Sequence, residues 1–98
     1  MNTITLNDVI AKESENPEFA EHFQRELLIN EIAKLVVELR KHADLTQRQL
    51  AEKAGTTQPV IARLESGVDN RIPSLELLAR LAAASNAKIK ITVDYIEK

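Results

Sequence analysis

The chain of 98 residues has the length of one domain with room for a short additional segment. Apolar residues make up 44% and charged residues 29% of the sequence, which is the balance of a globular protein rather than a disordered one. The absence of cysteine excludes disulfide scaffolds, thiol nucleophiles and zinc sites built on cysteine. The first twenty residues have neither a signal-peptide pattern nor a long apolar run, so we expect a soluble, cytoplasmic protein without a membrane partner.

The net charge of −2 comes from 13 basic and 15 acidic residues, a balance that argues against a partner as acidic as DNA. The charges are unevenly distributed, however. Residues 1–38 contain eight acidic and three basic residues, a net charge of −5, whereas residues 39–98 contain ten basic and seven acidic residues, a net charge of +3. This difference indicates two partners of opposite charge, with a chance difference between solvated helix faces as an equal alternative.

A long helix is predicted first. Asn16 followed by Pro17 is a typical helix start, because asparagine caps the end and proline fits the first turn. Apolar residues then recur at spacings of three and four, which predicts a helix that ends near residue 41 or 42. The pattern leaves open whether this helix is one rod of roughly 37 Å or breaks near residues 29–30. Before it, residues 6–11 predict a short helix capped by Asn7.

Two short helices follow, separated by a tight turn. Thr46 and Gln49 have the spacing of a capping box for a helix at about 46–54, and Gly55 ends this helix in the left-handed conformation. Thr57 caps the next helix, which ends at Gly67. Two short helices joined by a turn that contains glycine are typical of a helix-turn-helix.

The side chains of this segment fit such a pair of helices. Ala51 is small enough for the two helices to approach closely, while Ile61 and Leu64 anchor the second helix from below. The remaining side chains of the second helix are then expected to point outward: Thr57, Gln58, Pro59 and Arg63.

The last part of the chain changes from a helical to an alternating pattern. Ser74 caps a fourth helix at about 74–85, and Asn86 ends it. Residues 88–95 alternate polar and apolar side chains and are rich in β-branched types, which predicts a half-buried strand. A lone strand cannot satisfy its own backbone hydrogen bonds, so we expect it to pair outside the chain or to fold back irregularly.

The segment from Leu45 to Gly67, with "LTQ", "GTTQ" and "LESG" in order, resembles the helix-turn-helix domain of lambdoid phage repressors, Cro proteins and xenobiotic-response-element-type regulators. The resemblance covers residues 31–84. With its acidic extension and its terminal "KIKITV" strand, the whole chain is also similar to HigA-type antitoxins of type II toxin–antitoxin modules. The expected fold is mainly α, with an acidic helical arm at 1–30, a phage-repressor-like helix-turn-helix domain at 31–86, and a C-terminal strand and tail at 87–98 for dimerisation.

The resemblance implies that the helix from Thr57 to Ser66 enters the major groove of DNA. The residue types agree, because glutamine can read adenine through two hydrogen bonds, arginine can read guanine or a phosphate, and aliphatic carbons can contact a thymine methyl group. Gln47 resembles a position that holds a backbone phosphate in these repressors. The predicted DNA-binding residues are Gln47, Arg48, Thr57, Gln58, Pro59, Arg63 and Arg71. Lys53 is a further phosphate candidate, although it and Arg48 are equally explained as solvated side chains.

The family also pairs a basic residue at the end of its first helix with the glutamate of "LESG". In this chain these residues are Arg40 and Glu65. We expect a structural ion pair that ties the first helix to the recognition helix, since breaking a buried pair costs roughly 3–5 kcal/mol.

The antitoxin resemblance implies that the protein neutralises a HigB/RelE-like ribonuclease toxin by direct binding and represses its own operon as a dimer. Its expected partners are a palindromic operator in double-stranded DNA, a small basic toxin and a second copy, in a heterotetramer of two toxins and two antitoxins. Toxin contacts are assigned to the arm, at Glu18, Phe19, Glu21, Phe23, Glu26, Leu27 and Glu31. The alternative is that the arm only thickens a small core.

Dimer contacts are assigned to the apolar face of the predicted strand, at Ile89, Ile91 and Val93. This strand could instead dock onto the toxin. Two further alternatives are a free-standing transcriptional regulator without a toxin and a protein-interaction module that no longer binds DNA.

No catalytic, metal or cofactor site is predicted, so we do not expect an enzyme. His22 and His42 lack the spacing of metal ligands. The serines considered as nucleophiles have neither a nucleophile elbow nor a base at motif spacing: Ser14, Ser66, Ser74 and Ser85.

Overall fold

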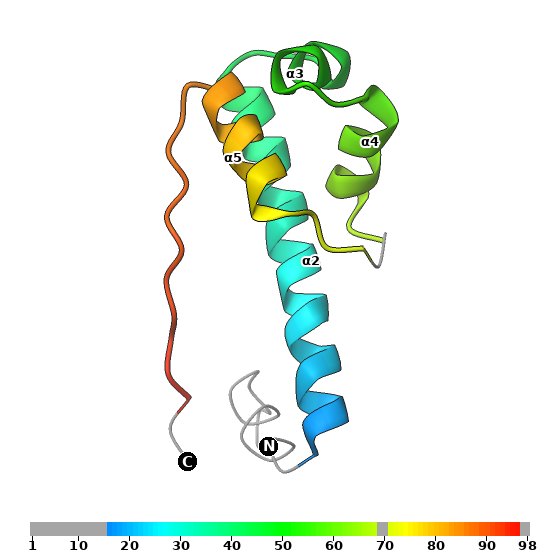
Figure 1. Ribbon diagram of the computed structural model, residues 1–98, viewed down its shortest axis with the longest axis vertical. Helices are drawn as coiled ribbons and strands as arrows, with labels where there is room; N and C mark the ends of the chain where they lie inside the picture. Colours follow the sequence, from blue (N-terminus) through cyan, green and yellow to red (C-terminus); the bar gives the residue numbers. More distant parts are fainter. Residues whose placement is uncertain (1–15, 69–70, 97–98) are drawn as a thin grey trace, which may run out of the picture.

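Four helices make up the part of the chain that the computed structural model describes, residues 16–68 and 71–96 (Figure 1). They are α2 (Pro17–His42), α3 (Gln47–Ala54), α4 (Gln58–Ser66) and α5 (Leu75–Ala84). The described chain is therefore mainly α, as predicted. The short helix predicted at residues 6–11 lies outside the described residues.

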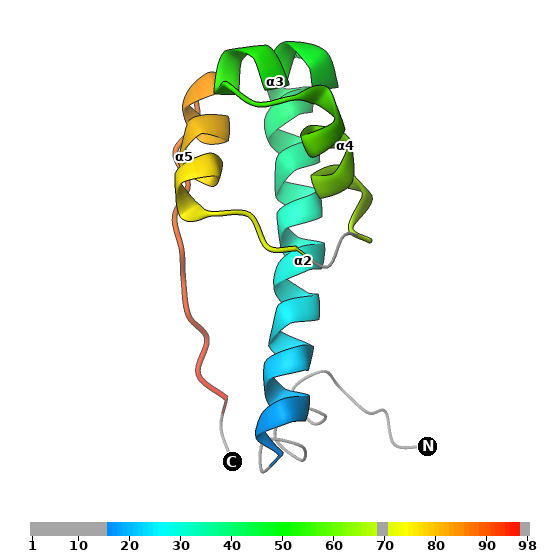
Figure 2. The same cartoon turned by 45° about the vertical axis from the view of Figure 1, so that its right-hand side comes forward.

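The longest helix, α2, is continuous over 26 residues, so the break considered near residues 29–30 does not occur. The side-chain oxygen of Asn16 accepts hydrogen bonds from the backbone N–H groups of Glu18 and Phe19, at 3.1 and 3.3 Å. The buried residues of α2 lie from its middle onward: Ile29, Ala33 and Val36. The first half extends beyond the other helices (Figures 1 and 2).

The start of α3 and the last turns of α3 and α4 follow the predicted capping signals, but the cap predicted at Thr57 was wrong, because Thr57 makes no side-chain hydrogen bond at the start of α4. The N–H of Gln49 donates to Thr46 Oγ1 at 3.1 Å, and the N–H of Thr46 donates to Gln49 Oε1 at 2.8 Å, so the capping box is complete. Gly55 and Gly67 end the two helices at φ angles of 71° and 70°, in the left-handed region that glycine adopts without the steric cost of a Cβ atom. A Cβ atom on Gly67 would lie 3.4 Å from Ala33 Cβ, so the end of α4 packs closely on α2.

The core lies where the second half of α2 meets the three shorter helices. Its buried cluster draws on all four helices: Val36, Leu50, Ala51, Ala54, Ile61 and Leu81. Both α2 and α3 contact α4 and α5, and the side chain at position 51 is 1% exposed. The small alanine predicted at the centre of the helix pair is therefore fully packed.

The predicted C-terminal strand is not observed. After α5, Ser85 caps the helix and Asn86 reverses the chain at a φ angle of 55°. Residues 87–96 then run alongside α2, toward the end at which α2 begins, without regular secondary structure (Figures 1 and 2). The prediction was wrong because a strand requires a hydrogen-bonded partner, and the described part of this chain has no second strand beside this segment.

Candidate nucleic-acid interface

The outer face of α4 consists of polar side chains held on an apolar anchor. Ile61 is fully buried and Leu64 is partly buried against the core. The four side chains expected to point outward are all exposed: Thr57, Gln58, Pro59 and Arg63. Thr57 makes no side-chain capping bond, so its hydroxyl group is not used to start α4. The structure therefore confirms which face of the helix is presented to solvent.

The glutamines at the first positions of α3 and α4 are hydrogen-bonded to one another. Gln58 Nε2 donates to Gln47 Oε1 at 2.8 Å. Gln47 Nε2 in turn donates to Glu65 Oε1 at 3.0 Å. The Gln47 side chain, expected at a DNA phosphate, is thus engaged with α4 at both ends of its amide group.

The expected pair of Arg40 and Glu65 is present and completes this network. Arg40 Nε and Nη2 donate to the two carboxylate oxygens of Glu65 at 2.7 and 3.1 Å. Arg40 Nη1 also donates to the carbonyl oxygen of Leu45 at 3.1 Å. One guanidinium group therefore connects the end of α2 with α4 and with the turn before α3.

Glu65 is the acceptor at the centre of the network, and its side chain is only 8% exposed. Burial by itself raises the pKa of Glu65, but the hydrogen bonds from Arg40 and Gln47 and the nearby charges of Arg40 and Lys41 outweigh it. The pKa of Glu65 therefore lies below its ordinary value, and the carboxylate stays ionised. The hydrogen bond between Arg40 and Glu65 also raises the pKa of Arg40 above its ordinary value, although burial opposes this shift.

The bonded Gln58 amide keeps the groups that recognition of a base requires. A primary amide has two N–H donors and one carbonyl acceptor, and Gln58 uses one donor on Gln47. The second N–H and the carbonyl oxygen form the donor and acceptor pair that matches adenine in the major groove. The hydrogen bond to Gln47 thus holds the Gln58 amide in place and leaves it one donor and one acceptor.

The basic residues predicted to contact DNA divide into two groups. Arg48 and Lys53 are exposed on α3. Arg63 of α4 and Arg71 of the following loop are exposed too, and they line one small hollow together with Ile29, Ile32, Leu64 and Pro73. The structure therefore brings Arg71 beside Arg63, although seven positions and the end of a helix separate them in sequence.

The residues assigned to toxin contact lie on the first half of α2 and at its middle. The rings of Phe19 and Phe23 are stacked, with centroids 5.9 Å apart. Neither ring belongs to the buried cluster, and the neighbouring Leu28 is 49% exposed. Leu27 is partly buried. The four glutamates of the set are exposed: Glu18, Glu21, Glu26 and Glu31.

The described residues lack the features of two other classes of site. No group of three or more histidine, cysteine, aspartate or glutamate side chains is arranged there to hold a metal ion. Within the same residues, no helix combines the length and the apolar character needed to cross a membrane.

The sequence points to the four residues of this network and to the pair of Arg40 and Glu65, but not to the hydrogen bonds that Gln47 makes with Gln58 and with Glu65. The hydrogen bond from Gln58 to Gln47 joins two helices across 11 positions. The only signal for it in the sequence is a glutamine directly after each of two helix caps, Thr46 and Thr57. That signal does not say how the two helices are oriented.

The sequence matches the family described as Helix-turn-helix over residues 36–94, which is more than half of the chain. No curated protein and no solved structure matches it. The matched region contains α3, α4 and α5 and all four residues of the network: Arg40, Gln47, Gln58 and Glu65. The chain belongs to the helix-turn-helix family of the Cro and phage-repressor type, whose domain is that of DNA-binding transcription regulators.

Proposed function

We propose that this protein is a sequence-specific repressor that inserts α4 into the major groove of its operator. The observation that carries the proposal is the Gln58 amide, which is exposed at the start of α4 and hydrogen-bonded to Gln47. In helix-turn-helix proteins the first residues of the second helix contact base edges. A side chain already held by a hydrogen bond, as Gln58 is by Gln47, loses less conformational entropy on binding than a mobile one.

The other exposed residues have distinct roles in this complex. Arg63 contacts a guanine or a phosphate, and the carbon atoms of Thr57 and Pro59 contact a thymine methyl group. Arg48 and the N–H groups at the start of α3 bind the phosphate backbone, which positions α4 but carries no sequence information. Glu65 is scaffold, because its carboxylate is occupied by Arg40 and Gln47.

The test is a comparison of operator and random DNA, with the operator obtained by selection from a random duplex library. Gln58→Ala should lower affinity for the operator by about 1–3 kcal/mol and leave affinity for random DNA nearly unchanged. Gln24→Ala, which removes an exposed glutamine from α2, is the matched control and should change neither. Equal losses on both DNAs would mean that Gln58 holds structure or backbone rather than a base.

We further propose that the repressor is an antitoxin and that the first half of α2 binds a basic ribonuclease toxin. Three features of this surface support the proposal. It extends beyond the bundle (Figure 1), it carries exposed glutamates, and it presents a stacked phenylalanine pair outside the core. Aromatic anchors with a charged rim are typical of protein interfaces, in which rim charges mainly raise the association rate.

The antitoxin proposal predicts a small basic reading frame beside this gene, and its product is the toxin for the test. Phe19→Ala with Phe23→Ala should weaken its capture by the full chain and speed its dissociation. Glu18→Lys with Glu21→Lys should slow association, mostly at low salt. Glu76→Lys, an exposed charge change on α5, is the control. Undiminished capture by both double variants would exclude the arm as the toxin site.

A further inference from the structure

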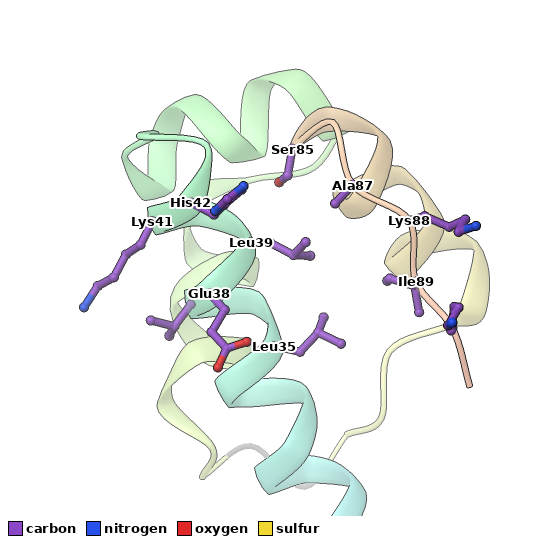
Figure 3. Close-up of a pocket in the computed structure, with 11 residues that line it drawn as sticks. Leu35, Glu38, Leu39, Lys41, His42, Ser85, Ala87, Lys88 and Ile89 are labelled. Atoms are coloured by element: carbon purple, nitrogen blue, oxygen red, sulfur yellow. The ribbon is translucent and has the colours of Figure 1, made fainter. Parts of the chain in front are cut away.

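An open groove of about 850 Å³ lies between the last turns of α2 and the segment that follows α5. Leu35 and Leu39 of α2 point into it from one side, and Ile89 faces them from the other, so these three residues form an apolar floor (Figure 3). All three are only partly buried, and apolar surface therefore remains for a ligand to cover. A hollow of this size, with apolar walls and a few polar groups, is typical of a small-molecule site.

The rim of this groove is positively charged. Lys41 of α2 and Lys88 and Lys90 after α5 line it, and Glu38 is the one acidic residue among its described lining residues. With histidine neutral, the lining has a net charge of +2, whereas the whole chain has −2. The three lysines are exposed, so their charges lie at the mouth of the groove while their aliphatic stems border the apolar floor. Such a rim favours a ligand with negative charge.

One end of the groove contains a hydroxyl group that the fold does not use. Ser85 lines this end together with His42 (Figure 3). Ser85 is 4% exposed, and its hydroxyl oxygen is buried without a hydrogen-bond partner among the described residues. A buried hydroxyl group without a partner is unfavourable. It can donate one hydrogen bond, which a carboxylate oxygen at this end of the groove would accept.

We propose that this groove binds a small amphipathic carboxylate. Its aliphatic chain lies along the apolar floor, and its carboxylate lies at the end that Ser85 and His42 form. A neutral apolar ligand would leave the Ser85 hydroxyl and the charged rim unused, and inorganic phosphate would leave the apolar floor uncovered. The site is separate from the proposed DNA contacts, because α4 lies on the other side of α2 from the segment after α5 (Figures 1 and 2).

Titration of octanoate into the full chain, followed by the backbone amide signals in NMR spectra, tests the site. Signals of residues 35–42 and 85–90 should shift and saturate, while those of α4 should stay in place. Butanoate has the same carboxylate and a shorter chain. Each buried CH₂ group raises affinity about fourfold, so octanoate should bind at least about tenfold more tightly than butanoate. Octylamine, with the same chain and the opposite charge, should bind more weakly than octanoate.

Three results of this titration would overturn the proposal. Shifts that do not saturate, or that fall mainly outside the groove, would show that octanoate has no defined site there. Equal affinity for octanoate and butanoate would exclude the apolar floor as a contact of the chain. Equal affinity for octanoate and octylamine would exclude recognition of an anion.

Charge variants of the rim should act in opposite directions, which partial unfolding cannot imitate. Lys88→Gln and Lys90→Gln should each weaken octanoate binding about threefold, the effect of one charge about 6 Å away in water. Glu38→Gln should tighten binding by a similar factor. Lys34→Gln and Glu76→Gln remove exposed charges outside the groove and are the matched controls. Unchanged affinity in all three groove variants would overturn the role of the rim.

Ser85→Ala tests the position of the carboxylate. It should weaken octanoate binding about tenfold, because a hydrogen bond to a charged group is lost. Binding of octanol, which has no carboxylate, should change less. Urea unfolding should show that the variant is at least as stable as wild type, since the hydroxyl group has no partner in the described structure. Unchanged octanoate affinity in the folded variant would overturn the contact with Ser85.

Discussion

Glu65 is the central acceptor of the side-chain network that joins α2, α3 and α4. It accepts hydrogen bonds from Arg40 and from Gln47, and Gln47 in turn holds Gln58. A buried carboxylate in a DNA-binding helix would be unfavourable on its own, because it is desolvated and repels phosphate. Its pairing with Arg40 offsets this cost and lets Glu65 support Gln58 through Gln47.

The lowered pKa of Glu65 predicts a pH-dependent stability. Because its pKa is lower in the folded chain than in the unfolded one, its contribution is fully present above the unfolded pKa of about 4.3 and is lost as pH falls through the folded pKa. Glu65→Gln should cost about 2 kcal/mol at pH 7, and this difference from wild type should shrink toward pH 3. Urea unfolding at a series of pH values measures it.

The control for this prediction is Glu52→Gln, which neutralises an exposed carboxylate on α3. At pH 7 it should stay within about 0.5 kcal/mol of wild type. A difference between Glu65→Gln and wild type that stays constant down to pH 3 would show that the charge of Glu65 does not stabilise the fold.

Ser85 is a second residue whose environment predicts a measurable effect. It is 4% exposed, and its hydroxyl oxygen is buried without a hydrogen-bond partner among the described residues. Ser85→Ala removes this desolvated group and should raise the free energy of unfolding by about 1 kcal/mol. Ser74→Ala should lower it by about 1 kcal/mol, since Ser74 accepts a capping bond from Leu77. Thermal unfolding of both variants compares them, and a destabilised Ser85→Ala would contradict the assignment.

At the scale of the elements, the two helices of the motif begin in different ways. α3 has a complete capping box, whereas Thr57 starts α4 without a side-chain hydrogen bond. Pro59 compensates in part, because its preset φ angle favours the first turn of a helix. The hydroxyl group of Thr46 is thus used to cap α3, whereas the hydroxyl group of Thr57 is not used to cap α4.

This difference predicts unequal effects for the same substitution. Thr46→Ala should lower the free energy of unfolding by about 1 kcal/mol, because it removes the cap of α3. Thr57→Ala should change stability by less than about 0.5 kcal/mol and lower operator affinity instead. Urea unfolding and operator titration of both variants separate the two roles. Equal losses of stability would mean that Thr57 does cap α4.

At the scale of the whole molecule, the net charge of −2 gives a misleading picture of DNA binding. The 26 residues of α2 span about 39 Å, and α3 lies at the far end from the exposed Glu18, Glu21 and Glu26 (Figures 1 and 2). Charges are screened over about 8 Å at physiological salt. The acidic end is therefore too distant to repel DNA at α3 and α4.

Salt dependence tests this separation. Each phosphate contact contributes about −0.9 to the slope of log K against log salt. Arg48→Gln should therefore make the slope less steep by about one unit on both operator and random DNA, whereas Gln58→Ala should leave it unchanged. Arg80→Gln, on the exposed side of α5, is the control. Affinity that is independent of salt would favour an interaction module that has lost DNA binding.

The sequence by itself determined the starts and ends of the described helices. Asn16, Thr46, Gly55, Gly67 and Ser74 act within a few residues of themselves, through caps and left-handed turns. The exposed face of α4 was also predictable, because it is the complement of the buried Ile61 and Leu64. Caps and helical periodicity depend only on residues a few positions apart, so these features could be predicted without knowing the fold.

Only the tertiary structure decided which distant groups meet. It joined Gln58 to Gln47 across 11 positions and placed Arg71 beside Arg63 in one hollow. It also left residues 88–95 without the strand that their alternation predicts. Alternation states which side chains share a face, but a strand exists only where a second backbone supplies the hydrogen bonds. The described chain supplies none to this segment, and the relative orientation of packed helices is not encoded in any one of them.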